Sequence, residues 1–262
     1  MSQDQSGTLS LMSLYEVGAH RGGKKSKLNP KLKSSVYGYS KGMCLIDLTE
    51  TTDTLARIED LARKIGSKKR QILIVGTSKH LKNLVPQYAE KFLGGPMPYV
   101  NSRWLGGSLT NWPTVKKTLK TLDNLTKIIE NEEFFNGLSK NEQLQIIRKR
   151  EKINKFFEGL AHLKHNRPGA VLVLNTVDDP IAIAEADTKN IPVIALTNTS
   201  STHLPKDLKY TLATNVHSIN AVELFMNRII EAYNEGVKSF VDQQQVKKEG
   251  GVKPNEKNKV KA

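Results

Sequence analysis

Few side chains in this 262-residue chain have both the type and the neighbours that catalysis requires. The stretch GAHRGGKK, which begins at Gly18, resembles a phosphate-binding loop, but Lys25 stands where that motif needs the hydroxyl that holds Mg²⁺. Asp178 and Asp179 follow an apolar run, although Asp-Asp-Pro is also ordinary chemistry for a helix start. The six histidines show no metal-ligand spacing, and no catalytic triad can be assembled. We therefore expect a protein that is not an enzyme and that needs neither a cofactor nor a metal.

One alternative stays open at the predicted strand ends. The segment LIVGTSKH, from Leu73 to His80, predicts a strand, a turn at Gly76 and a helix start that could receive an anion. Asp178 would lie at the same edge of an open α/β sheet, where such sheets usually bind ligands. The alternative is a flavodoxin-like nucleotide-binding protein or enzyme that uses the strand ends near Gly76 and Asp178. A single glycine at this position is far more often a tight turn.

Net charge gives a clearer signal about partners. Lys and Arg number 40 against 26 Asp and Glu, for a formal net charge of +14 and a pI near 9.7. Such an excess favours polyanions, nucleic acid above all. Between His20 and Lys41 the sequence has seven cations and no acid. They are Arg21, Lys24, Lys25, Lys27, Lys31, Lys33 and Lys41. Without an anion these cations would repel one another, so we predict that the segment contacts RNA.

The sequence has neither the signals of export nor those of a membrane protein. No apolar run approaches the roughly 18 residues that span a bilayer. The first residues, MSQDQSGTLS, lack the basic and apolar regions of a secretory signal and the arginines of a mitochondrial transit peptide. Cys44 is the only cysteine, which fits a reducing compartment. We expect a cytoplasmic protein, or one of the matrix or stroma if the gene is organellar.

Aromatic side chains accompany the cations in two places. Tyr37 and Tyr39 lie within the first cationic segment, among glycines that let backbone amides approach phosphates. The stretch RWLGGSLTNW, residues 103–112, holds both tryptophans around a Gly-Gly pair and leads into a basic helical pattern. Arg103 can reach phosphate, while the tryptophans can wedge the following segment against the body. Packing and direct RNA contact stay open as alternative roles for the two rings.

Short apolar runs alternate with amphipathic segments along most of the chain. The apolar runs that predict strands are 43–48, 71–76, 97–101, 170–175 and 191–197. Helical patterns occupy 49–66, the segment after Gly76, 181–186 and about 218–240. Short strands flanked by helices predict parallel βαβ units, in an α/β sheet with helices on both faces.

One interval departs from this alternation. From Pro113 to His165 there are only two helical patterns, separated by NEEFFNGLSKNE, and Ser139 and Glu142 have the spacing of a capping box. This pattern predicts an antiparallel α-helical hairpin, a basic coiled-coil arm inserted at 113–165. The remaining divisions that we predict are a flexible N-terminus at 1–10, a discontinuous α/β domain at 11–112 and 166–240, and a disordered basic tail at 241–262.

Seven segments between about Leu11 and Val237 resemble one known family. They read GAHRGGKKSKLNPKLKSSVYG, LIDLTET, ILIVGT, YVNSRWLGGSLTNWPTVKK, PGAVLVLNT, AIAEA and IPVIALTNT, in this order. They are similar to the ribosomal protein S2 family of the small subunit, in its bacterial or organellar form, and RWLGGSLTNW is the most specific of them. The resemblance implies a flavodoxin-like (Rossmann-like) sheet with a protruding helical hairpin. It also implies a structural, non-catalytic protein that binds rRNA between the head and body of the small subunit.

Three positions depart from the family's usual pattern. Members usually have an aromatic residue where Arg21 stands, a second histidine at Gly23 and an acidic residue at Thr197. In the family the histidine and acidic positions are linked to a metal and to docking of the large messenger-capturing ribosomal protein S-one. His20 is retained but the set is incomplete, so we expect no bound metal and leave the S-one contact open.

The candidate rRNA-binding residues come from the first cationic segment, the tryptophan loop and the start of the arm. They are His20, Arg21, Lys24, Lys25, Lys27, Lys31, Lys33, Asn101, Arg103, Trp104, Asn111, Lys116 and Lys117. The expected partners are small-subunit rRNA and neighbouring small-subunit ribosomal proteins, with no membrane. The expected function is that of a structural constituent of the ribosome that supports translation.

Overall fold

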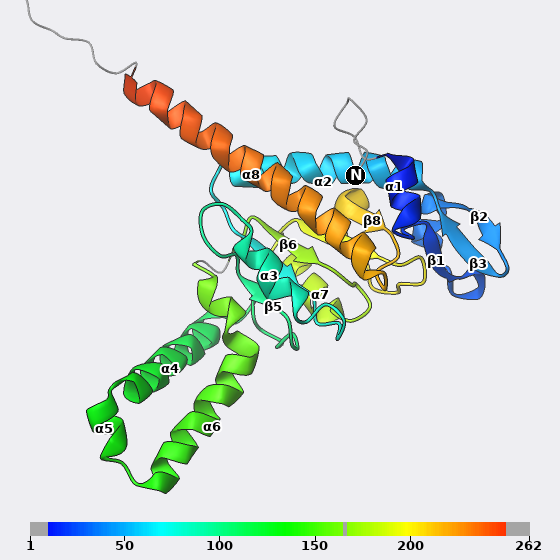
Figure 1. The fold of residues 1–262 in the computed structure, drawn as a ribbon. Helices are drawn as coiled ribbons and strands as arrows, with labels where there is room; N and C mark the ends of the chain where they lie inside the picture. Colours follow the sequence, from blue (N-terminus) through cyan, green and yellow to red (C-terminus); the bar gives the residue numbers. More distant parts are fainter. Residues whose placement is uncertain (1–9, 165–166, 250–262) are drawn as a thin grey trace, which may run out of the picture.

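The computed structural model describes residues 10–164 and 167–249, the last eight by their backbone alone, and contains two β-sheets (Figure 1). The larger sheet is parallel, in the order β5-β4-β6-β7-β8. Its strands are β4 (Ile72–Val75), β5 (Tyr99–Val100), β6 (Ala170–Val173), β7 (Val193–Thr197) and β8 (Thr211–Ala213). The smaller sheet is antiparallel, in the order β1-β3-β2.

The central strands of the parallel sheet are buried along their whole length. Every residue of β4 and β6 is buried, as expected for strands that are covered on both faces. Because side chains alternate between faces, Ile72 and Ile74 join one apolar cluster while Leu73 and Val75 join the other. The prediction of a parallel sheet with both faces covered is confirmed.

One face of this sheet is covered by four helices. They are α1 (Leu11–Glu16), α2 (Leu48–Gly66), α3 (Leu84–Glu90) and α8 (Ile219–Glu249). Helices α2 and α8 lie side by side (Figure 1) and meet at two glycines. A Cβ on Gly236 would lie 2.2 Å from the carbonyl oxygen of Arg63, and one on Gly66 would lie 2.3 Å from that of Tyr233. Only glycine permits this close contact between the helices.

The opposite face is covered by one α-helix, one loop and one short 3₁₀ helix. Helix α7 (Pro180–Thr188) contributes Ala182, Ile183 and Ala186 to the apolar cluster on this face. The loop that follows β5 adds Trp104 and Leu109, and the 3₁₀ helix η3 (Gly159–His162) adds Leu160. The tryptophan loop is therefore part of the core cover.

The strand predicted at 43–48 belongs to the smaller sheet. Strand β3 (Met43–Ile46) pairs antiparallel with β1 (Arg21–Lys24) and with β2 (Val36–Ser40). Our placement of this run in the parallel sheet is wrong. Cys44 and Ile46 are buried while Met43 is exposed, which is the one-sided burial of an antiparallel sheet rather than the two-sided burial of β4 and β6.

The predicted hairpin contains three helices. They are α4 (Trp112–Glu130), α5 (Glu132–Asn136) and α6 (Lys140–Phe157), and together they extend away from the sheets (Figure 1). The predicted capping box is confirmed: Ser139 N donates to a carboxylate oxygen of Glu142 at 3.0 Å, and Glu142 N donates to Ser139 Oγ at 3.4 Å. We did not predict the short helix α5 at the tip.

The arm has a thin core. Helix α4 buries Val115, Leu122 and Leu125, whereas no residue of α6 is buried. Polar contacts add to the pairing of the two helices, since Arg150 Nε donates to Thr126 Oγ1 at 3.2 Å. The arm is thus held together by few apolar contacts.

The last helix is longer than the sequence pattern indicated. We predicted its end near 240 and a disordered tail from 241, but α8 continues to Glu249. The predicted flexible residues 1–9 and the last part of the predicted tail, 250–262, lie outside the described residues. Among the described helices, none is both long enough and apolar enough to cross a membrane.

Replacing Gly236 with alanine should lower the free energy of unfolding by about 2–3 kcal/mol, because the added methyl group must displace α8 from the Arg63 carbonyl. Helix propensity alone would raise the free energy of unfolding by about 1 kcal/mol. The sign of the change therefore shows whether the close contact or the helix propensity dominates. Chemical denaturation followed by circular dichroism measures the change. Gly38→Ala is the control, since nothing lies within 4 Å of a Cβ there. Similar effects of the two substitutions would contradict the close helix contact.

Candidate nucleic-acid interface

The smaller sheet and the turns around it present the first cationic segment on the surface. Strand β1 carries Arg21 and Lys24, the 3₁₀ helix η1 (Lys25–Lys27) carries Lys25 and Lys27, and η2 (Pro30–Ser35) carries Lys31 and Lys33. All of these side chains are exposed, as is Lys41 in the turn after β2. Within the described residues none of the seven forms an ion pair. Their charges are therefore available to an external anion.

This cationic surface is fixed to the body by the loop that follows β7. Asn29 N donates to the Thr199 carbonyl at 2.9 Å, and Asn29 Nδ2 donates to the Ser201 carbonyl at 2.7 Å. Gly23 N donates to Thr199 Oγ1 at 2.8 Å. The Asn29 side chain also accepts from Lys31 N at 3.0 Å and so caps η2. The seven cations are thus held in fixed positions on one surface, which we call the cationic platform.

Two glycines of this platform serve packing. A Cβ on Gly22 would lie 2.9 Å from both the Cys44 carbonyl oxygen and Thr199 Oγ1. A Cβ on Gly23 would lie 2.8 Å from Ser200 Oγ. The sequence suggested that glycines here let the backbone approach phosphate, but Gly22 is buried. At these two positions glycine permits close contact with the loop after β7.

Three residues of this chain, His20, Gly23 and Thr197, occupy the positions that the resemblance links to a metal, and together they do not form a metal site. His20 is stacked on Tyr15, with ring centroids 4.3 Å apart, and burial followed by the charge of Arg21 lowers the pKa of its imidazole. Gly23 offers no ligand and has no room for one, and the Thr197 hydroxyl is hydrogen bonded to Thr176 at 2.8 Å. This set of donors lacks the second imidazole and the carboxylate that a cation would need.

Two tyrosines extend the cationic surface. Tyr37 on β2 is 80% exposed, and Tyr39 is 46% exposed. The Nζ of Lys25 lies 4.6 Å from the centroid of the Tyr39 ring, so a cation and an aromatic face are presented together. Exposed rings beside lysines are suited to stacking on unpaired RNA bases.

A buried carboxylate organises the tryptophan loop. Glu185, on α7, is only 7% exposed. It accepts five hydrogen bonds, from Trp104 Nε1 at 3.0 Å, Gly107 N at 2.7 Å, Leu109 N at 3.0 Å, Thr110 N at 3.1 Å and Thr110 Oγ1 at 3.1 Å. Burial alone would raise the pKa of Glu185, but the hydrogen bonds from the loop outweigh it and hold the pKa below its ordinary value.

Sequence reasoning missed Glu185. The available signal was an acid in the middle of AIAEA, residues 182–186, where its neighbours on the helix are buried alanine and isoleucine. An ionisable residue at such a position needs a buried partner. Nothing in the sequence identifies that partner as a loop some 80 residues away.

The loop residues chosen as RNA contacts have different surroundings. Trp104 is 5% exposed and lies within the apolar cluster, so its position favours the packing role. Arg103 is exposed beside it. Asn101 Nδ2 donates to the Lys82 carbonyl at 3.1 Å, and Asn111 Oδ1 accepts from Thr114 Oγ1 at 2.9 Å. RNA contact by any of these residues stays a prediction.

Both cationic groups lie at the carboxyl-end edge of the parallel sheet. The tryptophan loop follows β5, and the loop that anchors Gly23 and Asn29 follows β7. Strands β4 and β6 separate them, and three strand spacings amount to about 14 Å. Lys116 and Lys117, both exposed, continue the second group along the first turns of α4. The fold therefore brings the predicted residues to one edge, in two groups.

The carboxylates at the strand ends are bonded to the neighbouring loop. Asp179 is buried and accepts from Thr77 Oγ1 at 2.9 Å and from Thr77 N at 3.3 Å. Asp178 accepts from Asn175 Nδ2 at 2.8 Å and from the Ser78 hydroxyl. Burial, aided by the charge of Asp178, raises the pKa of Asp179 to about 6 despite the bonds from Thr77. These contacts tie the turn after β4 to the turn after β6.

Comparison with known proteins decides the family. The family model described as Ribosomal protein S2 matches residues 14–236. The chain belongs to the ribosomal protein S2 family. It is 34% identical over 252 residues to the small ribosomal subunit protein uS2 of Campylobacter fetus. The aligned residues are 96% of this chain and 95% of the relative. The uS2 protein of Campylobacter jejuni is 35% identical over 228 residues, covering 87% and 84%, and that of Campylobacter curvus is 34% identical over 235 residues, covering 90% and 86%.

Membership in the ribosomal protein S2 family confirms the resemblance, the fold class and the prediction of a non-enzymatic protein. Proteins of this family are structural components of the small ribosomal subunit. Nothing in these matches supports the alternative of a nucleotide-binding protein or enzyme. The bonded positions of Asp178 and Asp179 agree with a structural role for the strand ends.

Replacing Glu185 with glutamine should lower the free energy of unfolding at pH 7 by about 2–4 kcal/mol, because the amide group would face N–H donors of the loop. Trp104 fluorescence in a Trp112→Phe background reports the conformation of the loop directly.

The effect of Glu185→Gln should also depend on pH. Since the folded pKa of Glu185 is depressed, its contribution to the free energy of unfolding is complete above the unfolded pKa of about 4.3 and is lost as pH falls through the folded value. The difference from wild type should therefore narrow in acid. Glu90→Gln, at an exposed site on α3, should change stability by less than about 0.5 kcal/mol.

Replacing Asp179 with asparagine should change the free energy of unfolding with a pH dependence opposite to that of Glu185→Gln. The folded pKa of about 6 lies above the ordinary value, so the wild-type chain loses stability as pH rises from about 4 through 6. The variant lacks this titration, and its free energy of unfolding relative to wild type should increase by about 2 kcal/mol between pH 4.5 and pH 7.5. Urea denaturation at the two pH values tests this, with Asp53→Asn on the exposed side of α2 as control. A pH-independent difference would count against the raised pKa.

Proposed function

We propose that this chain is a structural constituent of the small ribosomal subunit that binds rRNA through its carboxyl-end edge and its arm. The observation that carries the proposal is the platform of seven exposed cations, free of ion pairs within the described residues and held in place by Asn29 and Gly23. Neutralised phosphates release counterions, which is a large source of affinity for nucleic acid. Tyr37 and Tyr39 add stacking surfaces for unpaired bases.

The second cationic group would contact a neighbouring part of the same RNA. Arg103, Lys116 and Lys117 are exposed where the arm leaves the body, and a separation of about 14 Å between strand ends spans several nucleotides of folded RNA. The family resemblance supports a position between the head and body of the subunit, on the solvent side. Other small-subunit proteins are the expected neighbours there.

The contact with the messenger-capturing protein S-one stays open at the loop after β7. In this loop Ser200 and Ser201 stand in place of an acidic stretch, and Thr199 and Ser201 anchor the cationic platform. The relatives with the uS2 name are bacterial, which supports a ribosome-bound protein of the bacterial cytoplasm.

Charge reversal of the platform tests the proposal. Replacing Lys24, Lys25, Lys27 and Lys31 with glutamate should flatten the slope of log affinity against log salt by about 3, since each neutralised phosphate contributes roughly 0.7–0.9. Binding to purified small-subunit rRNA is measured over a salt series, and co-sedimentation with small subunits is measured at low and high salt.

A matched variant separates the platform from general charge. Replacing Lys64, Lys68, Lys206 and Lys209 with glutamate changes the net charge equally, at exposed sites away from the platform. This control should keep most of the wild-type slope. An equal loss of slope in both variants would show that the platform is not the RNA-binding element. A wild-type chain that does not sediment with the small subunit would refute the proposed function.

A further inference from the structure

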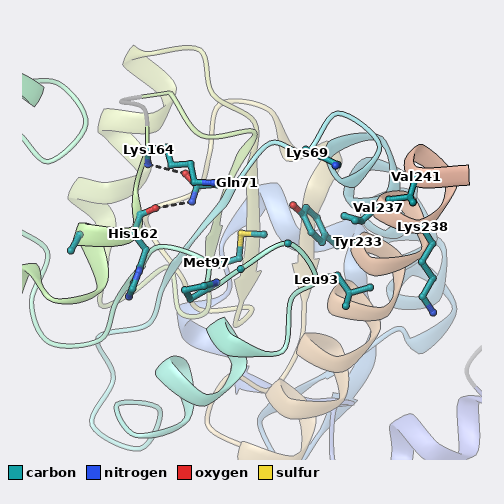
Figure 2. Close-up of a pocket in the computed structure, with 14 residues that line it drawn as sticks. Lys69, Gln71, Leu93, Met97, His162, Lys164, Tyr233, Val237, Lys238 and Val241 are labelled. Atoms are coloured by element: carbon teal, nitrogen blue, oxygen red, sulfur yellow. Dashed lines mark hydrogen bonds between the residues drawn. The ribbon is translucent and has the colours of Figure 1, made fainter. Parts of the chain in front are cut away.

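A cavity of about 790 Å³ lies at the amino-end edge of the parallel sheet (Figure 2). Gln71, directly before β4, and Met97, shortly before β5, both line it. We call it the amino-end cavity. Because the cationic platform lies at the carboxyl ends of the strands, the cavity is at the opposite edge of the sheet from the proposed RNA interface. Its volume is typical of ligand sites.

The inner surface of the amino-end cavity is mainly apolar. Met97, Tyr233 and Val237 are buried at 3%, 3% and 8% exposure and form its inner surface. At its mouth Leu93 is 42% exposed and Val241 is 40% exposed. The apolar lining therefore continues out of the cavity, which suits an occupant longer than a small molecule.

The walls of the cavity are held by specific hydrogen bonds. Gln71 Nε2 donates to the His162 carbonyl at 2.7 Å, and its Oε1 accepts from Lys164 N at 2.9 Å (Figure 2). On the other side, Leu93 N donates to Asn234 Oδ1 on α8 at 2.8 Å. The walls come from three elements: the segment after α6 by which the arm returns to the sheet, the loop before β5, and helix α8. A preformed cavity of this kind loses little entropy when it binds.

The charge around the mouth has one sign. Lys69, Lys164 and Lys238 are exposed lining residues, together with His162, and no acidic side chain lines the cavity among those that the structure describes. Figure 2 places Lys164 on one side and Lys69 and Lys238 on the other. A bound segment that carries carboxylates on either side of an apolar residue would be complementary to this arrangement.

The chemistry of the lining favours a peptide over RNA. Unpaired bases are recognised by exposed aromatic faces or by arginine. Among the described lining residues the only ring besides His162 is that of Tyr233, which is 3% exposed. The described part of the lining contains no arginine. Aliphatic side chains with a methionine form an adaptable surface for leucine-like anchors.

We propose that the amino-end cavity binds an acidic, amphipathic segment of a partner protein. An aliphatic side chain of that segment enters between Met97 and Val237, and flanking carboxylates pair with Lys69, Lys164 and Lys238. The chain's own ends lack this chemistry, since residues 250–262 have four lysines and one glutamate, and residues 1–9 have a single aspartate.

Fluorescence anisotropy on the purified full-length chain tests the proposal. The probe is a short fluorescein-labelled peptide in which leucines alternate with pairs of glutamates. It is compared with the same peptide carrying lysine for glutamate and with an oligouridylate of equal length. We expect the acidic peptide to bind and the Lys69→Glu/Lys238→Glu variant to weaken it by about tenfold. Lys64→Glu/Lys206→Glu, with the same net charge at exposed sites elsewhere, should weaken it by less than about threefold.

A second pair of variants tests the apolar part. Leu93→Ser should weaken the acidic peptide, whereas Ile181→Ser, at a 54% exposed site on α7, should not. Equal losses in test and control variants, or tighter binding of the lysine peptide or the oligouridylate, would overturn the proposal. The assay uses the isolated chain, so either result leaves the rRNA-binding function to its own salt-series test.

Discussion

One buried carboxylate determines how the arm leaves the body. Glu185 receives four N–H groups and a hydroxyl from the tryptophan loop, and it does so from the middle of a helix packed on the sheet. Taking an ionised carboxylate out of water is very unfavourable unless its hydrogen-bonding capacity is filled. The loop supplies those donors only in one conformation, in which Gly107 adopts a φ of 91° and Trp104 is buried. The start of α4, and with it the direction of the arm, follows from this arrangement.

The parallel sheet separates two kinds of surface. All five strands point the same way, so the loops after them gather at one edge and the segments before them at the other. At the carboxyl-end edge, Thr199 and Ser201 bond to Gly23 and Asn29 and so position the exposed lysines around them. At the amino-end edge, Gln71 and Asn234 hold the walls of an aliphatic cavity. The two contacts that we propose, with RNA and with a protein segment, lie at opposite edges of the sheet and would not compete.

The sequence predicted what depends on local periodicity and missed what depends on distant contacts. Strands β4 and β6 were predictable because ILIV and AVLV are continuous apolar runs, and the start of α6 was predictable because Ser139 and Glu142 bond within one turn. Strands β1 and β2 were not, since RGGK and VYGYS have neither a continuous apolar run nor an alternation of apolar and polar residues. Strand β8 has only three residues. Glu185 depends on partners 75 to 81 residues away and Gly23 on a partner 176 residues away, while Gly22 packs against both Cys44 and Thr199, so none of the three roles leaves a local pattern.

The uneven burial within the arm has a dynamic consequence. Because α6 contributes no buried residue, little free energy opposes its transient separation from α4, and the amide groups of the arm should exchange with solvent well before those of the sheet. RNA that contacts both helices would suppress these openings, and the entropy lost in that ordering would be subtracted from the affinity of the arm. Contact with RNA on both helices would therefore make the hairpin more rigid than it is in the isolated chain.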